Sequence, residues 1–555
     1  MKRFKAIAVA AVATGVLAAG CSSSGSSGTT ASGKIGGTVT ISNESGGLWT
    51  CGFNPFNPSV QFLSLGILYE PLVFVNALKS AATTPWLASS YAWSNNNTTL
   101  TFTIRSGVKW SDGQPMTAAD VLYTFNLIKA HPALDLNSVW SVLSNVSQQG
   151  DKIVMNFKNP AVPYFYYIAD QVGIVPQHIW STIKGDPAQY IDAHPVATGP
   201  YTVNPCTPQN ITYQRNPSYW QPGLPKMQTV QYPAFTSNDP ANLQLANGQA
   251  QWGSQFIPNI DAFYKSKSPD HHYWFPPIAQ VSLFINQTVS PLTNVTVRQA
   301  MAYAIDRNRV SQVGEYGYEP PANQNGVVTP TFQSWLDKGQ QSQYNYTYNP
   351  SKANSMLDAA GFTKGSDGIR VSPQGKKLVF NVINQGDYSD WVASMNEIQQ
   401  QLKAVGIQLN QLNLSSNDFD NRLFNGQFDL AYYEETAGPT PYYEFRQWLY
   451  SKNSAPIGTA ASTNYERYSN PATDALLEAY GATTDPAKQK SIVNQLQTVM
   501  LQDVPLIPVT EGVDWYQYNT ANISGWATES DPFAQPAAFQ VPDLEVMLLH
   551  LAPKS

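Results

Sequence analysis

Long hydrophobic runs and charged side chains are both scarce in this sequence of 555 residues. Only 13% of the residues are charged, and 32 basic and 38 acidic side chains give a net charge of −6 without long blocks of one sign. No apolar run of membrane-spanning length follows residue 20. We therefore expect a globular body that does not cross a bilayer, and no nucleic-acid partner, because no basic face is available to follow phosphates.

Motifs for catalysis and for metal binding are also missing. The six histidines are dispersed, and His271 and His272 are neighbours whose side chains point to opposite faces of an extended chain. There is no H-E-x-x-H motif, no phosphate-binding G-x-x-x-x-G-K-[ST] loop, and no G-x-S-x-G motif beyond the Ser/Gly-rich stretch near the N-terminus. These absences predict a protein without metal, cofactor or enzymatic activity, and they assign any ATPase to a separate subunit.

The first residues predict export. Lys2, Arg3 and Lys5 form a basic head, and an apolar stretch over 6–19 is followed by small residues, which is typical of a signal peptide over 1–20. The stretch 17–21 resembles a bacterial lipobox, although Ala18 stands where the box usually has a large aliphatic residue. Cys21 is then the lipid anchor on the extracytoplasmic face of the cell membrane, the periplasmic side if an outer membrane is present, and ordinary secretion is the alternative.

Two features of the remaining chain agree with export. Residues 21–35 are rich in Ser and Gly, a composition that forms flexible tethers. Cys51 and Cys206 are the two cysteines left after Cys21, and an exported protein meets oxidising conditions in which such a pair can form a disulfide bond. We expect one bridge between them and no zinc site.

Aromatic residues are abundant, with 14 Trp, 30 Tyr and 23 Phe. With so few charges, this composition suits stacking against, and hydrogen bonding to, neutral or weakly charged solutes. The length exceeds what one hydrophobic core supports, so we expect two or three domains.

Local patterns predict a strand over 37–42 and a hairpin in which the strand 100–104 is followed by 108–113, with Asp112 and Gly113 at the turn. Thr117 and Asp120 then form a shortened capping box at the start of a helix. The whole stretch 102–121 resembles the signature of family 5 extracellular solute-binding proteins, the peptide and nickel binders of ABC importers.

This resemblance extends in the family's order over nearly all of the chain after the tether. Matching segments are found at 68–72, 198–201, 215–220, 283–286, 297–307, 349–353, 428–431 and 469–474. The resemblance implies an α/β, two-lobed clamshell of the periplasmic-binding-protein type (type II, large cluster, with an extra inserted domain). The expected lobe I comprises 36–64, 198–280 and 510–555, the inserted domain 65–197, and lobe II 281–509.

The resemblance also implies a function, namely capture of a solute between the lobes by a monomer and its delivery to ABC permease subunits with their ATPase. Peptide-binding relatives commonly have an aspartate near 432–443 that pairs with the ligand's ammonium group. No aspartate stands there, so Glu434 or Glu435 would have to substitute. An oligopeptide is the leading ligand, and a cello-, xylo- or manno-oligosaccharide is the alternative.

Candidate ligand contacts follow from these two alternatives. Tyr433, Glu434 and Tyr442 belong to the segment 432–443, and Asn286 ends a strand that lies near the cleft in this family. Trp49, Trp252 and Trp391 are candidate stacking platforms for sugars, although each could equally belong to a core. A secreted glycosidase is a remote alternative, since the consecutive Glu434 and Glu435 would diverge instead of flanking one bond. A cell-wall structural protein would have no cleft at all.

Overall fold

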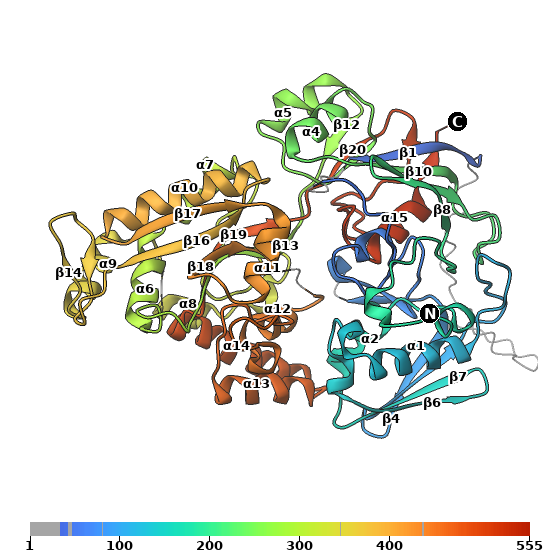
Figure 1. Cartoon of the computed structure of the whole chain (residues 1–555), viewed down its shortest axis with the longest axis horizontal. Coiled ribbons are helices and arrows are strands. Elements are labelled where there is room, and N and C mark those ends of the chain that lie inside the picture. The colour runs from blue at the N-terminus through green and yellow to red at the C-terminus, as the bar shows by residue number, and fades with distance from the viewer. Residues whose placement is uncertain (1–33, 43–46, 80, 345, 436–437, 555) are drawn as a thin grey trace, which may run out of the picture.

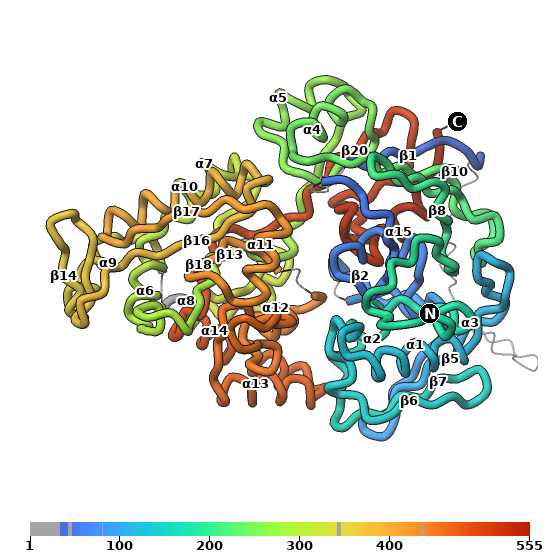
Figure 2. The backbone as a smooth tube through the Cα atoms, viewed as in Figure 1, coloured from blue at the N-terminus to red at the C-terminus, as the bar shows by residue number. Residues whose placement is uncertain are grey.

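The chain forms two bodies that are joined by two short crossing segments (Figures 1 and 2). The computed structural model describes residues 34–42, 47–79, 81–344, 346–435 and 438–554. The body on the right of Figure 1 holds both ends of the described chain, and the body on the left is built from its middle. The predicted signal peptide, Cys21 and the tether up to residue 33 lie outside the described residues.

A seven-stranded sheet forms the upper part of the right body (Figure 1). The predicted first strand is β1 (Gly36–Ser42), which pairs in parallel with β10 so that Val39 lies opposite Val230. The strand order is β12 (His271–Tyr273), β20 (Gln517–Asn519), β11 (Trp252–Gly253), β1, β10 (Met227–Pro233), β9 (Asn210–Arg215) and β8 (Tyr201–Thr207). Helices α4 (Asn238–Ala246), α5 (Ile260–Phe263) and α15 (Asp543–His550) belong to the same region.

The lower part of the right body is a four-stranded antiparallel sheet in the order β4 (Ala88–Ser94), β5 (Thr99–Ile104), β7 (Lys152–Phe157) and β6 (Leu143–Gln149). Helix α1 (Ala118–Ala130) packs on β6 and β7. Its capping box is the predicted one, because the Thr117 N–H donates to Asp120 Oδ2 over 2.8 Å. Short elements complete this part, namely β2 (Val73–Asn76), β3 (Ala82–Pro85), α2 (Phe165–Ala169) and α3 (Gln177–Trp180).

The predicted hairpin between 100–104 and 108–113 is wrong. Strand β5 pairs with β4 and β7 instead. The Asp-Gly turn does form, since the Gly113 N–H donates to the Trp110 carbonyl, but it closes a single bridge between Lys109 and Pro115. A turn signal thus fixed the local reversal of the chain and not the partner of the strand.

The left body is a five-stranded sheet in the order β17 (Gln408–Leu414), β16 (Val379–Gln385), β18 (Leu430–Tyr433), β13 (Pro277–Ile285) and β19 (Leu506–Val513). Strand β16 is parallel to both of its neighbours, whereas β13 is antiparallel to β18 and β19. Around it are α6 (Val295–Ala304), α7 (Arg307–Gly314), α8 (Lys338–Gln343), α9 (Pro350–Ala359), α10 (Ser389–Ala404), α11 (Ser416–Phe424), α12 (Pro441–Leu449), α13 (Pro471–Gly481) and α14 (Pro486–Asp503). Two pairs of two-residue strands remain: β14 (Thr363–Lys364) with β15 (Arg370–Val371) in this body, and β21 (Ile523–Ser524) with β22 (Ala552–Pro553) in the right body.

The crossing segments are residues 274–276 and 514–516, which run between the two large sheets (Figure 2). They bond to each other, because the Trp274 N–H donates to the Tyr516 carbonyl (3.0 Å) and the Asp514 N–H donates to the Pro276 carbonyl (2.9 Å). The expected lobe boundaries at 280 and 509 fall inside β13 and β19. Both strands lie entirely in the left sheet, so the junctions shift to the crossing segments.

Cys51 and Cys206, the pair considered above, are joined by a disulfide bond with their Cα atoms 5.8 Å apart. The bond attaches the loop that follows β1 to β8, at the edge of the seven-stranded sheet. Among the described residues, no helix is both long and apolar enough to span a membrane.

Candidate functional site

A cavity of about 390 Å³ lies where the two bodies meet. Three parts of the chain line it. The right body contributes Pro58, Gln61, Phe62, Phe539, Gln540 and Val541 from the upper part and Leu136, Asn137, Ser138, Tyr166, Tyr167 and Gln171 from the lower part; the left body contributes Gly438, Arg446, Gln447, Asn453, Ser462 and Thr463. Amides, hydroxyls and aromatic rings dominate this lining. Among the described lining residues, Arg446 is the one whose side chain is charged at neutral pH.

The wall of the upper right body is held in place from behind. Trp49 is buried, donates from Nε1 to the Tyr232 carbonyl (2.8 Å) and contacts the ring of Phe62 (centroids 6.1 Å apart). Phe53 lies in the same loop as Trp49, and its N–H donates to the Ile191 carbonyl. Trp49 therefore supports a residue of the cavity wall from the core instead of lining the cavity.

Helix α12 and the segment 162–169 bring the two bodies together on the side away from the crossing segments (Figure 1). Tyr443 on α12 donates its hydroxyl hydrogen to the Pro163 carbonyl, and its ring lies 5.3 and 5.0 Å from those of Tyr166 and Tyr167. Tyr442 on the same helix reaches the Tyr164 hydroxyl over 3.3 Å. The two bodies thus touch through tyrosines, two of which, Tyr166 and Tyr167, also line the cavity.

Arg446 lies one turn further along α12. Its side chain is 4% exposed, and its guanidinium group lies over the rings of Tyr164, Tyr167 and Tyr450 at 5.4–5.6 Å. Its Nε has no hydrogen-bond partner among the described residues. Its backbone carbonyl accepts a hydrogen bond from Asn453 (3.2 Å), another residue of the lining.

Buried carboxylates lie behind the left wall. Glu434 and Glu435 follow β18, and burial raises the pKa of Glu434 to about 7 and that of Glu435 to about 8. Both carboxylate oxygens of Glu435 lack a hydrogen-bond partner, as do those of Glu444 and Glu466. Neither Glu434 nor Glu435 is among the described residues that line the cavity.

Glu434 instead faces the hinge strand. A side chain at Gly512 of β19 would place its Cβ 2.3 Å from Glu434 Oε2. The glycine leaves room for the carboxylate, which therefore lies against the strand that leads into the crossing segment 514–516. Asp514 in that segment accepts a hydrogen bond from Gln540 (2.9 Å), and this contact links the hinge to the cavity lining.

Three other candidate contacts lie inside the bodies. Trp252 is fully buried, and its Nε1 donates to the Pro536 carbonyl over 2.9 Å. Trp391 packs in the core of the left body against Tyr432. Asn286 is 1% exposed and donates to the carbonyls of Gly426 and Phe428, so its amide stabilises the end of β13.

The tyrosines are closer to the cavity without lining it. Tyr433 packs against Phe284 and Phe419, and Tyr442 is stacked on Tyr480 with the centroids 4.1 Å apart. Sequence reasoning missed the residues that do line the cavity. Arg446 had a usable signal, because it lies four and three residues after Tyr442 and Tyr443 and so shares their helix face. Gln61, Tyr167 and Gln540 had no local signal.

The histidine pair has a structural place. His271 stacks on Tyr264 at 4.3 Å, and His272 stacks on Tyr518 at 5.2 Å, on the two faces of β12. Within the described ranges, no group of three or more His, Cys, Asp or Glu side chains could hold a metal ion.

A polar cavity between two bodies that are joined by two short segments is the arrangement of a binding protein that closes on its ligand. Residues 82–456 match the model of the bacterial extracellular solute-binding proteins, family 5. The chain belongs to this family. Its members are solute-binding components of ABC transporters and not enzymes, and the chain shares this role.

Comparisons with individual proteins agree. The glutathione-binding protein GsiB of Shigella dysenteriae is 25% identical over 441 residues, which cover 76% of this chain and 79% of that protein. The mannohexaose-bound periplasmic oligopeptide-binding protein of Thermotoga maritima superposes with a TM-score of 0.85 at 26% identity, over 93% of this chain and 98% of that one. AppA of Bacillus subtilis, in complex with a nonapeptide, superposes with a TM-score of 0.79 at 19% identity, over 94% and 100%. The predicted α/β periplasmic-binding-protein fold is confirmed.

Proposed function

We propose that this protein captures an oligosaccharide in the interlobe cavity and delivers it to the permease of an ABC importer. The observation that carries the proposal is the chemistry of the lining. Its amides and hydroxyls can donate to and accept from sugar hydroxyls, and Phe62, Tyr166, Tyr167 and Phe539 offer rings for stacking on sugar faces. No carboxylate is among the described lining residues.

The Thermotoga protein supports this choice, since its structure contains mannohexaose and its similarity covers nearly the whole chain. The rings that would serve are not the three tryptophans expected from the sequence, which are buried in the cores. The cavity size lies within the range of sites for small ligands.

An oligopeptide, the leading expectation from the sequence, is the second candidate, and the unpartnered carboxylate of Glu435 favours it. A carboxylate in the low-dielectric interior binds an ammonium group strongly if the two can meet. Because its pKa is raised to about 8, Glu435 is largely protonated at neutral pH, and a peptide ammonium would have to displace that proton. Peptide binding would then release a proton and tighten between pH 6 and pH 8.

The remaining parts of the proposal follow from the family and the N-terminus. The protein acts as a monomer, anchored by a lipid on Cys21 to the extracytoplasmic face of the membrane. The Ser/Gly-rich segment 21–35 allows the two bodies to reach the permease, and a separate ATPase subunit drives transport.

A thermal-shift screen of the protein from Lys34 onward tests the ligand class. Selective binding to the folded state raises the apparent melting temperature. We expect cello-, xylo- or manno-oligosaccharides to raise it, and tri- to pentapeptides to leave it unchanged. A rise with peptides alone would replace the proposal by the second candidate.

Variants locate the site. Tyr167→Ala should reduce the sugar-dependent rise, because it removes a ring from the lining. The matched control is Tyr348→Ala, whose ring is 44% exposed and outside the lining. Equal effects of the two variants would place the ligand elsewhere.

A further inference from the structure

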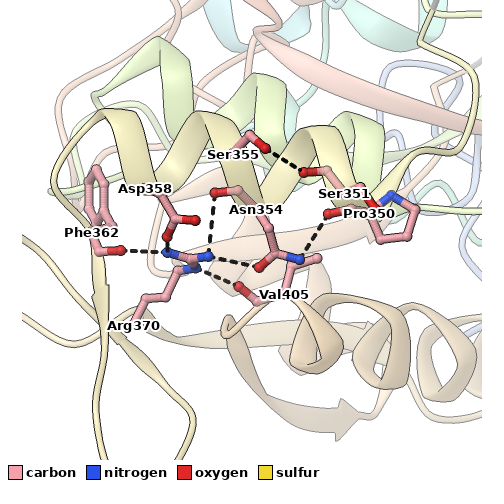
Figure 3. A network of polar contacts seen from close by, with 8 residues as sticks. All are labelled: Pro350, Ser351, Asn354, Ser355, Asp358, Phe362, Arg370 and Val405. Atoms are coloured by element: carbon pink, nitrogen blue, oxygen red, sulfur yellow. Dashed lines mark hydrogen bonds and ion pairs between the residues drawn. The ribbon is translucent and has the colours of Figure 1, made fainter.

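Buried arginines in this protein have their guanidinium groups satisfied by the protein itself. Arg370 is the clearest case (Figure 3): it is 1% exposed, and it donates to the carbonyls of Val405 and Phe362 and to the side chains of Asp358 and Asn354. Because each N–H has a partner, this charge is compensated where it stands and has a structural role.

Three more of the five buried arginines in the described part of the chain follow the same rule. Arg298 donates to the carbonyls of Leu292, Asp503 and Val504, and Arg307 to three carbonyls and the Gln324 side chain. Arg467 donates to four carbonyls. Backbone oxygens at the ends of neighbouring elements thus neutralise the buried cations.

Arg446 departs from this rule. It is 4% exposed, its Nε has no partner, and it makes no ion pair with a described carboxylate. The tyrosine rings around it attract the cation, and the side chains of Tyr164 and Tyr167 hydrogen-bond its guanidinium group, but neither tyrosine carries a negative charge that would compensate it. A buried donor without a partner costs free energy, so the free Nε–H and the uncompensated charge of Arg446 in a cavity wall point to an acidic partner that enters from the cavity.

The acidic groups nearby do not fill this role. Asp135, whose pKa the Arg446 charge tends to lower, uses its two oxygens to accept the N–H groups of Val139 (2.7 Å) and Trp140 (3.0 Å). Glu444 on the same helix is fully buried toward Gln280 and Glu511. Neither carboxylate is within ion-pair distance of the guanidinium group.

We propose that Arg446 binds a carboxylate group of the solute. The planar guanidinium group matches a carboxylate in geometry and charge, and the burial of Arg446 would strengthen that pair. The carboxylate could belong to a uronic acid unit of an oligosaccharide or to the C-terminus of a peptide. The inference rests on the proposed function for the uronic acid and on the second candidate for the peptide terminus, and it predicts that an acidic member of either class binds more tightly than a neutral one.

Matched ligands test the proposal on the unaltered protein. Isothermal titration would compare β-1,4-linked triglucuronate with cellotriose, and trialanine with trialanine amide, at two salt concentrations. A buried charge-assisted hydrogen bond contributes about 10- to 100-fold in affinity. Of the two ligands compared, the one with the carboxylate should therefore bind more tightly by this factor. Which pair binds distinguishes the uronic acid from the peptide terminus.

Variants assign the effect to Arg446. Arg446→Gln should abolish the preference for the carboxylate member and leave the affinity for the neutral member within about threefold, and Arg446→Lys should retain part of the preference. The control is Arg422→Gln on the exposed face of α11, which should change neither affinity.

Two failures are distinguishable. If no oligosaccharide binds the unaltered protein, the proposed function is wrong. If ligands bind and the neutral member of each pair binds as tightly as the carboxylate member, the function stands and the role of Arg446 is wrong. The second comparison needs no variant, so it holds even where Arg446→Gln fails to fold.

Discussion

Gly199 occupies a position where a neighbouring backbone leaves no room for a side chain. A Cβ there would lie 2.5 Å from the Leu68 carbonyl oxygen and 2.6 Å from that of Ile67, and the Gly199 N–H donates to the same Leu68 oxygen over 2.7 Å. Backbone cannot move aside as the end of a flexible side chain can. Gly199→Ala should therefore lower the free energy of unfolding by roughly 2–4 kcal/mol, measured by chemical denaturation.

The control for this substitution is Gly36→Ala in β1, where a Cβ would meet no atom within 4 Å. It should change the stability by less than about 0.5 kcal/mol. Equal stabilities of the two variants would mean that the backbone at 67–68 can move to make room for the new side chain. The close packing of Gly199 against this backbone would then not contribute to stability.

Glu435 makes stability depend on pH. Burial raises its pKa to about 8, well above that of an unfolded glutamate, so the folded protein holds a proton that the unfolded chain releases. This contribution is complete below about pH 4.5 and is lost as the pH rises toward 8. Glu435→Gln should flatten the decline of the melting temperature between pH 5 and pH 8, and it should stabilise the protein at pH 8.

The exposed Glu529 provides the comparison, since its replacement by Gln should leave the pH profile unchanged. A profile of Glu435→Gln that runs parallel to that of the unaltered protein would show that Glu435 is ionised at neutral pH. The side chain would then have a partner, and the case for a peptide ammonium group would gain weight.

At the residue scale, the sequence was informative where the physics is local. The capping pair of Thr117 and Asp120 is three residues apart, and its hydrogen bonds could be predicted from the spacing alone. The place of Trp252 depends on Pro536, which is 284 residues away, and nothing near Trp252 indicates that contact. Burial of an aromatic side chain is therefore decided by the tertiary fold, which single residues do not reveal.

Helix α12 joins the two bodies on the side away from the hinge. Tyr443 contributes a hydrogen bond to Pro163 and ring contacts with Tyr166 and Tyr167. Aromatic pairs contribute about 0.5–1.5 kcal/mol each beyond their buried area. Tyr443→Ala should thus disfavour the closed arrangement, and the solute affinity should fall about tenfold or more, with a larger radius of gyration in solution scattering.

Tyr443→Phe keeps the ring contacts and loses the hydroxyl. Its solute affinity and its radius of gyration should therefore lie between those of the unaltered protein and those of Tyr443→Ala. Tyr316→Ala, at a ring that is 50% exposed, is the matched control and should alter neither quantity. Unchanged scattering for Tyr443→Ala would show that these contacts follow closure without stabilising it.

At the element scale, the presence of a strand was easier to predict than the strand with which it pairs. The alternation of residues 100–104 predicts a strand, and β5 forms there. Its partner β7 begins 48 residues after β5 ends, with helix α1 between them, and the turn at Gly113 does not indicate this pairing. Likewise, β13 and β19 lie more than 200 residues apart in sequence and are neighbours in one sheet. Pairing over such distances could not be predicted, because no pattern near either strand indicates its partner.

At the scale of the whole molecule, the left body is a single continuous insertion. Its five strands and one core cluster, from Val281 to Val509, all lie within residues 277–513, and its first and last strands pair with each other. Its other buried residues, Phe445 and Trp448 of α12 among them, belong to the core cluster that extends into the right body. The right body is discontinuous, since the chain leaves it at 274–276 and returns at 514–516. Closure then amounts to rotation of one self-contained unit about two short bonded segments.

This topology predicts that residues 277–513 fold without the rest of the chain. A unit with its own core and its own strand pairing, whose ends lie side by side, satisfies the conditions for an independent domain. We expect a cooperative thermal transition by circular dichroism and dispersed amide signals by NMR. The matched control is the fragment 286–505, which lacks β13 and β19 and should remain unfolded because β18 then loses its antiparallel neighbour. If 277–513 also lacks a cooperative transition, the left body depends for its folding on the contacts of α12 with the segment 162–169. The protein would then be one folding unit that bends, instead of two units that rotate.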